Sequence, residues 1–266
     1  MTIIESLEAM YSDHLPAEYP DEQSYKVAWQ RITTSDLFLA ALQGGLIADR
    51  LSWVFLAAYQ SAVRACFDGL PSGRFISYAA SEDRTGEYPG ASIDENSRLQ
   101  GNKSWIASSK TVDGLLVTVG DSIIHVPADR EGISLTHRES PAFLGDLSQG
   151  MAAFKDVVIQ KSDYVRDHRV SDFRIAEPFF VTVSACGFLW AQYAVGRSQL
   201  SDIVNALHDI YSAGFTQDAN GLLGCHQRLK SVGKACAAEL PSTDWSTSGG
   251  LLGMYRANLE ALTQSD

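Results

Sequence analysis

The middle of this chain changes its hydrophobic period, and that change limits the folds open to it. Residues 101–134 read GNKSWIASSKTVDGLLVTVGDSIIHVPADREGIS, with two apolar runs in partial alternation and breaks at glycine and proline. A period of two is typical of half-buried strands, whereas the flanking sequence repeats at three- and four-residue steps, as helices do. We therefore expect a strand module between helical segments.

Short strands are expected between residues 75 and 164. The segment GLLVTVGDSIIHVP predicts a hairpin, because Gly120-Asp121 is a turn sequence between two apolar runs. The segment RLQGNKSWIAS is interpreted as two strands around a Gly-Asn turn, and FISYAA, GISLTHR and MAAFKDVVIQ predict further strands. SEDRTGEYPGASIDENS is typical of a loop. The pattern indicates roughly six antiparallel strands in a sheet or small barrel.

Helical periodicity governs both ends of the chain. Ser35-Asp36 is a candidate N-cap for an apolar helix that runs to about residue 69. Gly44-Gly45 near its start marks either a kink or a close approach of another backbone. The predicted fold class is α+β, with an N-terminal helical domain at residues 1–73, a middle β-domain at 74–165 and a C-terminal helical domain at 166–266.

Charge and composition exclude several classes of partner. The formal net charge is −11 at pH 7, so a broad basic face for nucleic acid or for an anionic membrane is not expected. The N-terminus lacks the basic start and apolar centre of a signal peptide. The apolar residues 37–66 include Asp49-Arg50, which would be costly in lipid. We expect a cytoplasmic protein without a membrane partner.

Common catalytic and metal motifs are missing from the sequence. It contains no Gly-x-Gly-x-x-Gly, no Walker loop, no Gly-x-Ser-x-Gly elbow and no His-Glu-x-x-His. The four cysteines form no Cys-x-x-Cys pair and are expected to be buried and reduced. No metal site is predicted. His125 lies in an apolar strand and is interpreted as a structural histidine rather than a catalytic base.

Four segments of the strand region carry a resemblance. They are SEDRTGEY at residues 81–88, GNKSWIASSKTVDGLLVTV at 101–119, IIHVPADREGISL at 123–135 and GMAAFKDVVI at 150–159. Each segment alone is weak, but four in this order are specific. They resemble the middle β-domain of the acyl-CoA dehydrogenase family, in which a β-barrel lies between an N-terminal helical domain and a C-terminal four-helix domain.

The resemblance implies a divergent, shortened member of that family, which uses FAD to remove hydrogens from Cα and Cβ of an acyl-CoA. It implies that Trp105 covers the isoalloxazine ring, that Ser81 supplies a hydroxyl, and that Ile106 and Ala107 belong to the same cofactor site. A flavin needs such surroundings, because it is a large apolar ring with a polar edge. From the residues alone, Trp105 is interpreted as a core aromatic of the sheet.

Several departures from the family concern the chemistry itself. Ala107 stands where the family has a threonine at the flavin edge, and Ser108 and Ser109 are the hydroxyls that would compensate. Asp83 adds negative charge near the expected path of the pyrophosphate. The family's Arg-x-x-Phe-Gly segment is missing. The late glutamates, Glu239 and Glu260, do not match the family's catalytic glutamate, so no catalytic residue is assigned.

Three readings of the function therefore stay open. The first is an active FAD-dependent acyl-CoA dehydrogenase, and the second is a subunit without its own base that pairs with a complete partner. The third is a degenerate, non-catalytic relative that serves as a scaffold or binding protein. By resemblance, acyl-CoA is the expected ligand, and the helical domains are expected to form a homodimer or a hetero-oligomer.

Overall fold

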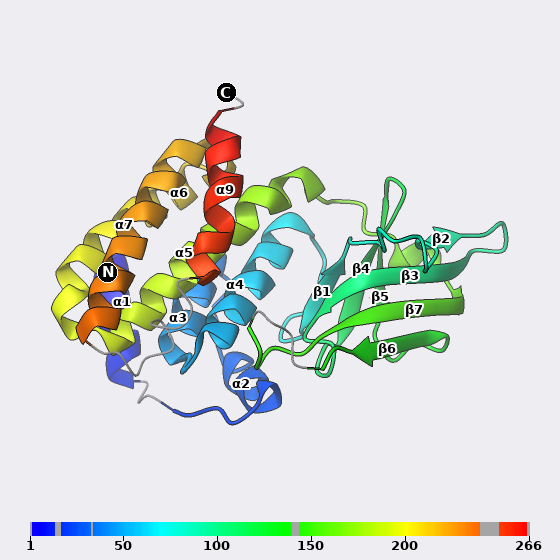
Figure 1. The fold of residues 1–266 in the computed structure, drawn as a ribbon, viewed down its shortest axis with the longest axis horizontal. Helices are drawn as coiled ribbons and strands as arrows, with labels where there is room; N and C mark the ends of the chain where they lie inside the picture. Colours follow the sequence, from blue (N-terminus) through cyan, green and yellow to red (C-terminus); the bar gives the residue numbers. More distant parts are fainter. Residues whose placement is uncertain (1, 14–16, 33, 140–143, 240–249, 265–266) are drawn as a thin grey trace. The chain divides into compact units, whose positions relative to one another are not determined.

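A computed structural model describes residues 2–13, 17–32, 34–139, 144–239 and 250–264 (Figure 1). Two compact units make up the chain. The helical unit comprises Met1–Pro20, Arg31–Cys66 and Arg169–Asp266, and the strand unit comprises Asp21–Gln30 and Phe67–His168. The N-terminal sequence thus contributes to both units. The three-domain division at residues 73 and 165 stays a prediction.

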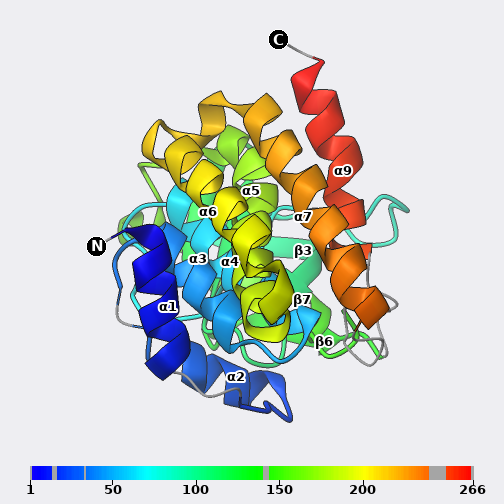
Figure 2. The same cartoon turned by 90° about the vertical axis from the view of Figure 1, so that its left-hand side faces the viewer.

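The helical unit is built around its longest apolar helix. Its helices are α1 (Ile3–Asp13), α3 (Leu37–Ile47), α4 (Leu51–Cys66), α5 (Phe173–Gln192), α6 (Arg197–Ser212), α7 (Ala219–Glu239) and α9 (Gly250–Thr263). Figure 2 looks onto this unit, in which α5 packs against α3, α4, α6, α7 and α9. Short 3₁₀ turns of this unit occur at Val170–Asp172, Ala194–Gly196 and Phe215–Gln217, and another, at Lys161–Asp163, lies in the strand unit.

The burial of α5 explains its unusually apolar sequence. Val170–Gln192 is long and apolar enough to cross a membrane, yet 83% of its most apolar window is buried within the protein. A helix that is apolar on most sides is typical of the centre of a bundle. The cysteines follow the same rule, since Cys66, Cys186, Cys225 and Cys236 are all buried and unpaired, as predicted.

The apolar segment after Asp36 forms two helices rather than one. Asp36 caps α3 as predicted, because its carboxylate accepts hydrogen bonds from the N–H groups of Phe38 and Leu39 at 2.8 and 3.1 Å. The helix then stops at Ala48, whose backbone is extended. Asp49 follows, and its side chain accepts a hydrogen bond from Tyr19 N at 2.9 Å. This polar corner separates α3 from α4.

The glycine pair in α3 marks a close approach of two backbones, not a kink. A Cβ atom on Gly45 would lie 2.6 Å from the carbonyl carbon of Ser184 in α5 and closer still to its oxygen. Gly187 in α5 faces α3 in the same way, since its Cβ would lie 2.9 Å from Leu46 N. Glycine on both helices therefore lets α3 and α5 touch along their backbones.

The strand unit contains two sheets instead of a closed barrel. Its strands are β1 (Ile76–Ala79), β2 (Ser92–Ile93), β3 (Arg98–Ala107), β4 (Gly114–Val119), β5 (Ser122–Pro127), β6 (Ile133–His137) and β7 (Gln149–Val158). One sheet has the order β1-β4-β5 and the other β2-β3-β7-β6. The expected hairpin is confirmed, because β4 and β5 pair from Val119–Ser122 outward. Apolar side chains of both sheets form one core.

Two expectations for this unit were wrong. The sheets are not wholly antiparallel, because β1 pairs with β4 in parallel. Parallel pairing requires a crossover, which residues 80–113 supply. The Gly-Asn pair is not a turn, since β3 continues through it. Gly101 has a φ of 99°, and a Cβ there would lie 2.7 Å from the carbonyl carbon of Gly90. The glycine makes room for a neighbouring backbone.

The close contact between α3 and α5 can be tested with two alanine substitutions. Gly45→Ala should lower the free energy of unfolding by more than about 2 kcal/mol, because the new methyl group must push α5 away. Gly224→Ala, in α7, is the matched control, since no atom lies within 4 Å of its Cβ position. It should instead add up to about 1 kcal/mol through helix propensity. Urea denaturation of both variants measures the difference, and equal effects would contradict the contact.

Candidate functional site

The structure places the four predicted cofactor residues at the end of β3 and beside it. Ile106 and Ala107 are buried, with exposed fractions of 0% and 1%, and Ile106 belongs to the core that the two sheets share. Ala107 N donates a hydrogen bond to Ser77 Oγ at 3.0 Å. Both residues therefore support the site from within the sheet. Ser81 and Trp105 are the two whose side chains reach the surface.

Trp105 is held at one edge and remains partly accessible. It lies where the β3–β7 pairing shifts register between Lys103 and Ile106. Such an irregularity re-aims side chains relative to the sheet. The indole Nε1 donates to Gln149 Oε1 at 3.3 Å, and Gln149 is itself paired with Ala107 across the sheet. The ring is thereby fixed in orientation while part of it stays accessible.

Ser81 lies beside the same strand. Its carbonyl oxygen accepts a hydrogen bond from Ser104 N at 2.8 Å, which attaches the loop after β1 to the residue before Trp105. The Ser81 side chain is exposed. The topology therefore brings Ser81 and the neighbourhood of Trp105 together, although they are more than twenty residues apart in sequence.

The two serines that follow Ala107 have different surroundings. Ser109 Oγ lies 3.0 Å from His137 Nδ1 and is therefore already engaged. Ser108 has a φ of 54°, a left-handed conformation that is uncommon for residues other than glycine. Its hydroxyl is buried and finds no hydrogen-bond partner among the described residues. Of the two hydroxyls, only that of Ser108 is left available in the described part of the chain.

The acidic loop after β1 is organised by its own hydrogen bonds. Glu82 Oε1 accepts from Lys103 Nζ at 2.8 Å, and this lysine is 1% exposed at its side chain. Asp83 accepts from Thr85 Oγ1, Thr85 N and Tyr88 N at 2.7, 3.0 and 3.1 Å. These bonds lower the pKa of Asp83 to about 2, with the Thr85 hydroxyl the largest cause. Lys103 thus balances the charge of Glu82, whereas Asp83 stays negative.

These side chains fit the ring end of a flavin. Trp105 offers part of an aromatic face and Ser81 offers an exposed hydroxyl, whereas the unpartnered hydroxyl of Ser108 is buried in the described chain. Ala107 offers no side-chain donor, and its N–H group is already bonded to Ser77. An aromatic face beside a hydroxyl suits an apolar ring with a polar edge, and Ser81 is the accessible hydroxyl of this set. Among the described residues, no group of three His, Cys, Asp or Glu side chains is arranged to hold a metal ion.

A carboxyl group in the helical unit was missed by sequence reasoning. Glu177 lies in the second turn of α5, directly before Pro178. Burial raises the pKa of Glu177 to about 7, and the smaller effect of the Tyr255 hydroxyl on α9 opposes it. That hydroxyl lies nearby without meeting hydrogen-bond geometry. The Glu177 side chain as a whole is partly accessible. The signal available in the sequence was one carboxylate within the apolar run 175–191.

Glu239 and Glu260, the two glutamates near the C-terminus considered from the sequence, have structural roles, as does Arg197. Glu239 Oε1 accepts from Tyr193 Oη at 3.0 Å, and Glu260 forms a 2.6 Å ion pair with Arg256. Arg197 donates from Nε to Trp190 O, and its guanidinium lies 4.2 Å from the centre of the Tyr11 ring. The contacts of Glu239 and Arg197 tie α1, α6 and α7 to the C-terminal end of α5, whereas the Glu260 pair lies within α9.

His125 also has a structural position. It is half-buried in β5, and burial lowers its pKa, against the raising effect of Asp163. It lines a cleft of about 430 Å³ at the edge of the β1-β4-β5 sheet together with Arg74, Asp113 and Pro127. None of the four predicted cofactor residues lines this cleft.

Comparison with known proteins gives matches in structure only. No family model matches the sequence, and no curated protein resembles it significantly. The apo form of PigA superposes with a TM-score of 0.64 at 12% identity, covering 97% of this chain and 92% of that chain. Butyryl-CoA dehydrogenase from Megasphaera elsdenii gives 0.63 at 10% identity, with coverages of 98% and 94%.

The name of a third matching structure refers to an acyl carrier protein instead of CoA. The prolyl acyl carrier protein oxidase AnaB gives a TM-score of 0.61 at 11% identity, covering 97% of this chain and 92% of that chain. PigA has also been determined with FAD, and with FAD and proline. Identities this low establish the fold alone. At that level the resemblance found in the sequence is confirmed, and this protein has the acyl-CoA dehydrogenase-like fold.

Proposed function

We propose that this protein is an FAD-dependent dehydrogenase that acts on an acyl thioester, with Glu177 as its proton acceptor. The observation that carries the proposal is the raised pKa of Glu177, a partly accessible carboxyl group in a protein of acyl-CoA dehydrogenase-like fold. Trp105 and Ser81 support it, because an accessible aromatic ring and a nearby hydroxyl suit a flavin.

The reaction requires a base with a particular acidity. The α-proton of a thioester is weakly acidic, and a carboxylate whose pKa lies near the working pH both takes it up and gives it back efficiently. Glu177 meets that condition, because burial raises its pKa to about 7. When bound, FAD would accept the hydride that leaves Cβ. The burial that raises the pKa of Glu177 also makes its carboxylate a stronger base.

The proposal covers any acyl thioester, whether CoA or an acyl carrier protein carries it. The matched proteins bear names that refer to butyryl-CoA, glutaryl-CoA and a prolyl acyl carrier protein. All three substrates present a thioester, so the chemistry at Glu177 is the same for each. A cytoplasmic location and assembly as a homodimer or hetero-oligomer are further expectations for this protein.

A second candidate function is a non-catalytic relative of the same fold. Ala107 favours it, because this position has no hydroxyl and its N–H group already bonds Ser77 Oγ. The ionised Asp83 also favours it, since a fixed negative charge in the loop next to Ser81 would repel a diphosphate. A subunit that shares its active site with a complete partner would behave in the same way when it is purified alone.

Flavin binding separates these candidates. The purified protein should bind FAD, show the visible absorbance of oxidised flavin and unfold at a higher temperature when FAD is added. Trp105→Leu should weaken FAD binding about tenfold through loss of aromatic contact. Tyr88→Leu is the matched control, because Tyr88 is an exposed aromatic of the same unit. A colourless protein with no FAD-dependent stabilisation would favour the non-catalytic reading or the dependence on a partner.

The role of Glu177 has a kinetic test. Glu177→Gln should leave FAD affinity unchanged and slow flavin reduction by an acyl-CoA about 10² to 10⁴-fold, the range that a general base contributes. Glu177→Asp should retain part of the activity. The control is Glu8→Gln, at an exposed glutamate of α1. Stopped-flow bleaching of the flavin gives the rates, and full activity in Glu177→Gln would remove Glu177 from the mechanism.

The pH dependence of stability tests the surroundings of Glu177 without any ligand. Its pKa is about 7 in the fold against a usual 4.5, so the native state binds more protons between these values. The free energy of unfolding should therefore fall as pH rises from 4.5 to 7, by on the order of 3 kcal/mol at most. Urea denaturation across this pH range should show this loss in the wild type but not in Glu177→Gln, and the loss should end above pH 7. Parallel curves across the whole range would contradict the burial of the carboxyl group.

A further inference from the structure

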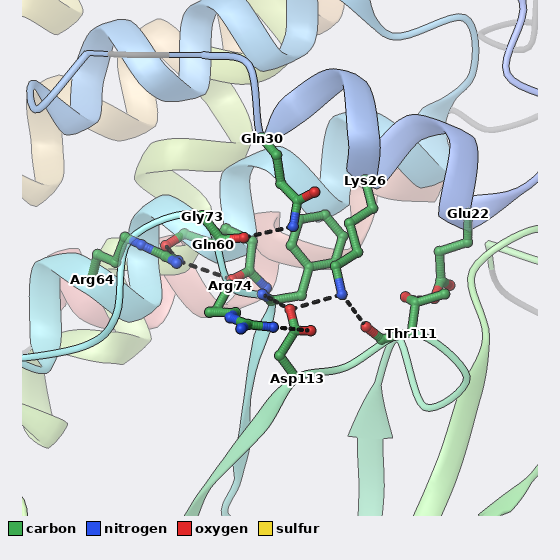
Figure 3. A network of polar contacts seen from close by, with 10 residues as sticks. Glu22, Lys26, Gln30, Gln60, Arg64, Gly73, Arg74, Thr111 and Asp113 are labelled. Atoms are coloured by element: carbon green, nitrogen blue, oxygen red, sulfur yellow. Dashed lines mark hydrogen bonds and ion pairs between the residues drawn. The ribbon is translucent and has the colours of Figure 1, made fainter. Parts of the chain in front are cut away.

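Helix α2 (Glu22–Trp29) belongs to the strand unit and meets it with a row of polar side chains. Glu22, Lys26 and Gln30 are spaced four residues apart and therefore share one face. Lys26 Nζ lies 2.7 Å from Asp113 Oδ2 and donates to Thr111 O at 2.6 Å. Gln30 Nε2 donates to Gly73 O at 2.6 Å (Figure 3). These two side chains dock the C-terminal half of the helix.

Glu22 has a different set of partners from the other two. It is 6% exposed, and its carboxylate accepts hydrogen bonds from Thr111 Oγ1, from Ser148 N at 2.7 Å and from Ser148 Oγ at 3.0 Å. Figure 3 shows it pointing to the loop that carries Thr111. Thr111 and Ser148 lie in two separate loops, one after β3 and one before β7. A single carboxylate therefore links both loops.

The two linked loops lead directly to the candidate site. Thr111 N and Val112 N donate to Ser108 O at 2.8 and 2.7 Å, which closes the turn that begins at Ser108. Ser109 N donates to Ser148 O at 3.1 Å, and Lys110 N donates to Ser148 Oγ at 2.9 Å.

The second loop reaches the aromatic residue of the site. Gln149, the residue after Ser148, accepts the hydrogen bond from Trp105 Nε1. An unbroken chain of hydrogen bonds and adjacent residues thus connects the Glu22 carboxylate to both ends of the segment 105–109.

We infer that Glu22 is a positioning residue that fixes the Trp105–Ser109 edge of the site through Thr111 and Ser148. The assignment of a flavin to that edge rests on the proposed function, but the mechanical role of Glu22 does not. The left-handed Ser108 is the point that most needs such support, because a serine holds this conformation only when its surroundings impose it.

The donors around Glu22 determine which substitutions preserve the link. Ser148 N can only donate, whereas the hydroxyls of Thr111 and Ser148 can also accept. A glutamine at position 22 can present its oxygen to Ser148 N and its amide group to the two hydroxyls. Glu22→Gln should therefore retain the edge. Glu22→Ala removes every acceptor and leaves the Ser148 N–H group without its partner.

Hydrogen exchange and FAD affinity together test this role. In Glu22→Ala, exchange of the Ser109 and Lys110 amides should become about tenfold faster, and FAD should bind about tenfold more weakly. Glu22→Gln should restore both values to within about twofold of the wild type. Gln30→Ala is the matched control, because it removes another polar anchor of the same helix face, away from the edge. It should leave the exchange rates of both amides and the FAD affinity unchanged.

The two readouts keep the inference separate from the proposed function. If the wild type binds no FAD, the proposed function fails, and amide exchange still decides the role of Glu22. The inference is wrong, and Glu22 merely docks the helix, if amide exchange at Ser109 and Lys110 is unchanged in Glu22→Ala. The same conclusion follows if exchange speeds up equally in Gln30→Ala. Thermal unfolding of each variant confirms that the comparison is made between folded proteins.

Discussion

The direct contact between the backbones of α3 and α5 is the constraint on which the helical unit depends. Gly45 and Gly187 remove the side chains that would keep the two helices apart. Ser184 then contacts both neighbours, because its carbonyl faces Gly45 and its hydroxyl donates to Val54 O on α4 at 3.0 Å. Helix α5 is thus fixed in rotation as well as in position. Glu177 precedes Ser184 by seven residues, about two helical turns, so both lie on the same face of α5.

The strand unit has irregular backbone at the candidate site and regular pairing in its hairpin. The hairpin of β4 and β5 pairs without interruption, whereas β3 shifts register twice against β7. Trp105 sits at the second shift, and the left-handed Ser108 follows it. Bulges and strained residues cost stability, so they persist only where the surroundings hold them. The buried Lys103, paired with Glu82, supports this segment before Trp105. The carboxylate of Glu22 on α2 supports it after Ser108.

Local sequence patterns predicted most of the elements of this fold but not how they meet. Periodicity identified the helices and most strands, and Gly-Asp identified the hairpin, because both signals arise from neighbours along the chain. Gly101 was misread as a turn, since the Gly90 backbone it accommodates comes from a distant segment. The parallel β1–β4 pair and the break at Ala48 likewise depend on contacts that no short window contains.

The candidate site was predictable only where a motif carried it. Trp105 and Ser81 followed from the resemblance of the segments around them. Glu177 gave no motif, because what distinguishes it is burial by α5 and its neighbours, and burial is a property of the packed bundle. The same holds for Glu22, whose partners lie 89 and 126 residues away in sequence. In the sequence alone, both are ordinary glutamates near the start of a helix.

The cost of enclosing Glu177 bears on the choice between an active and a degenerate protein. A carboxyl group whose pKa is raised by burial destabilises the fold at neutral pH, and a glutamine or an apolar residue would avoid that cost. A scaffold gains nothing from such a group, whereas a base that must accept a proton near neutrality requires it. Ala107 offers no hydroxyl, and the unpartnered hydroxyl of Ser108, one residue further on, is buried in the described chain. The raised pKa of Glu177 is therefore the feature that supports the proposed catalytic role.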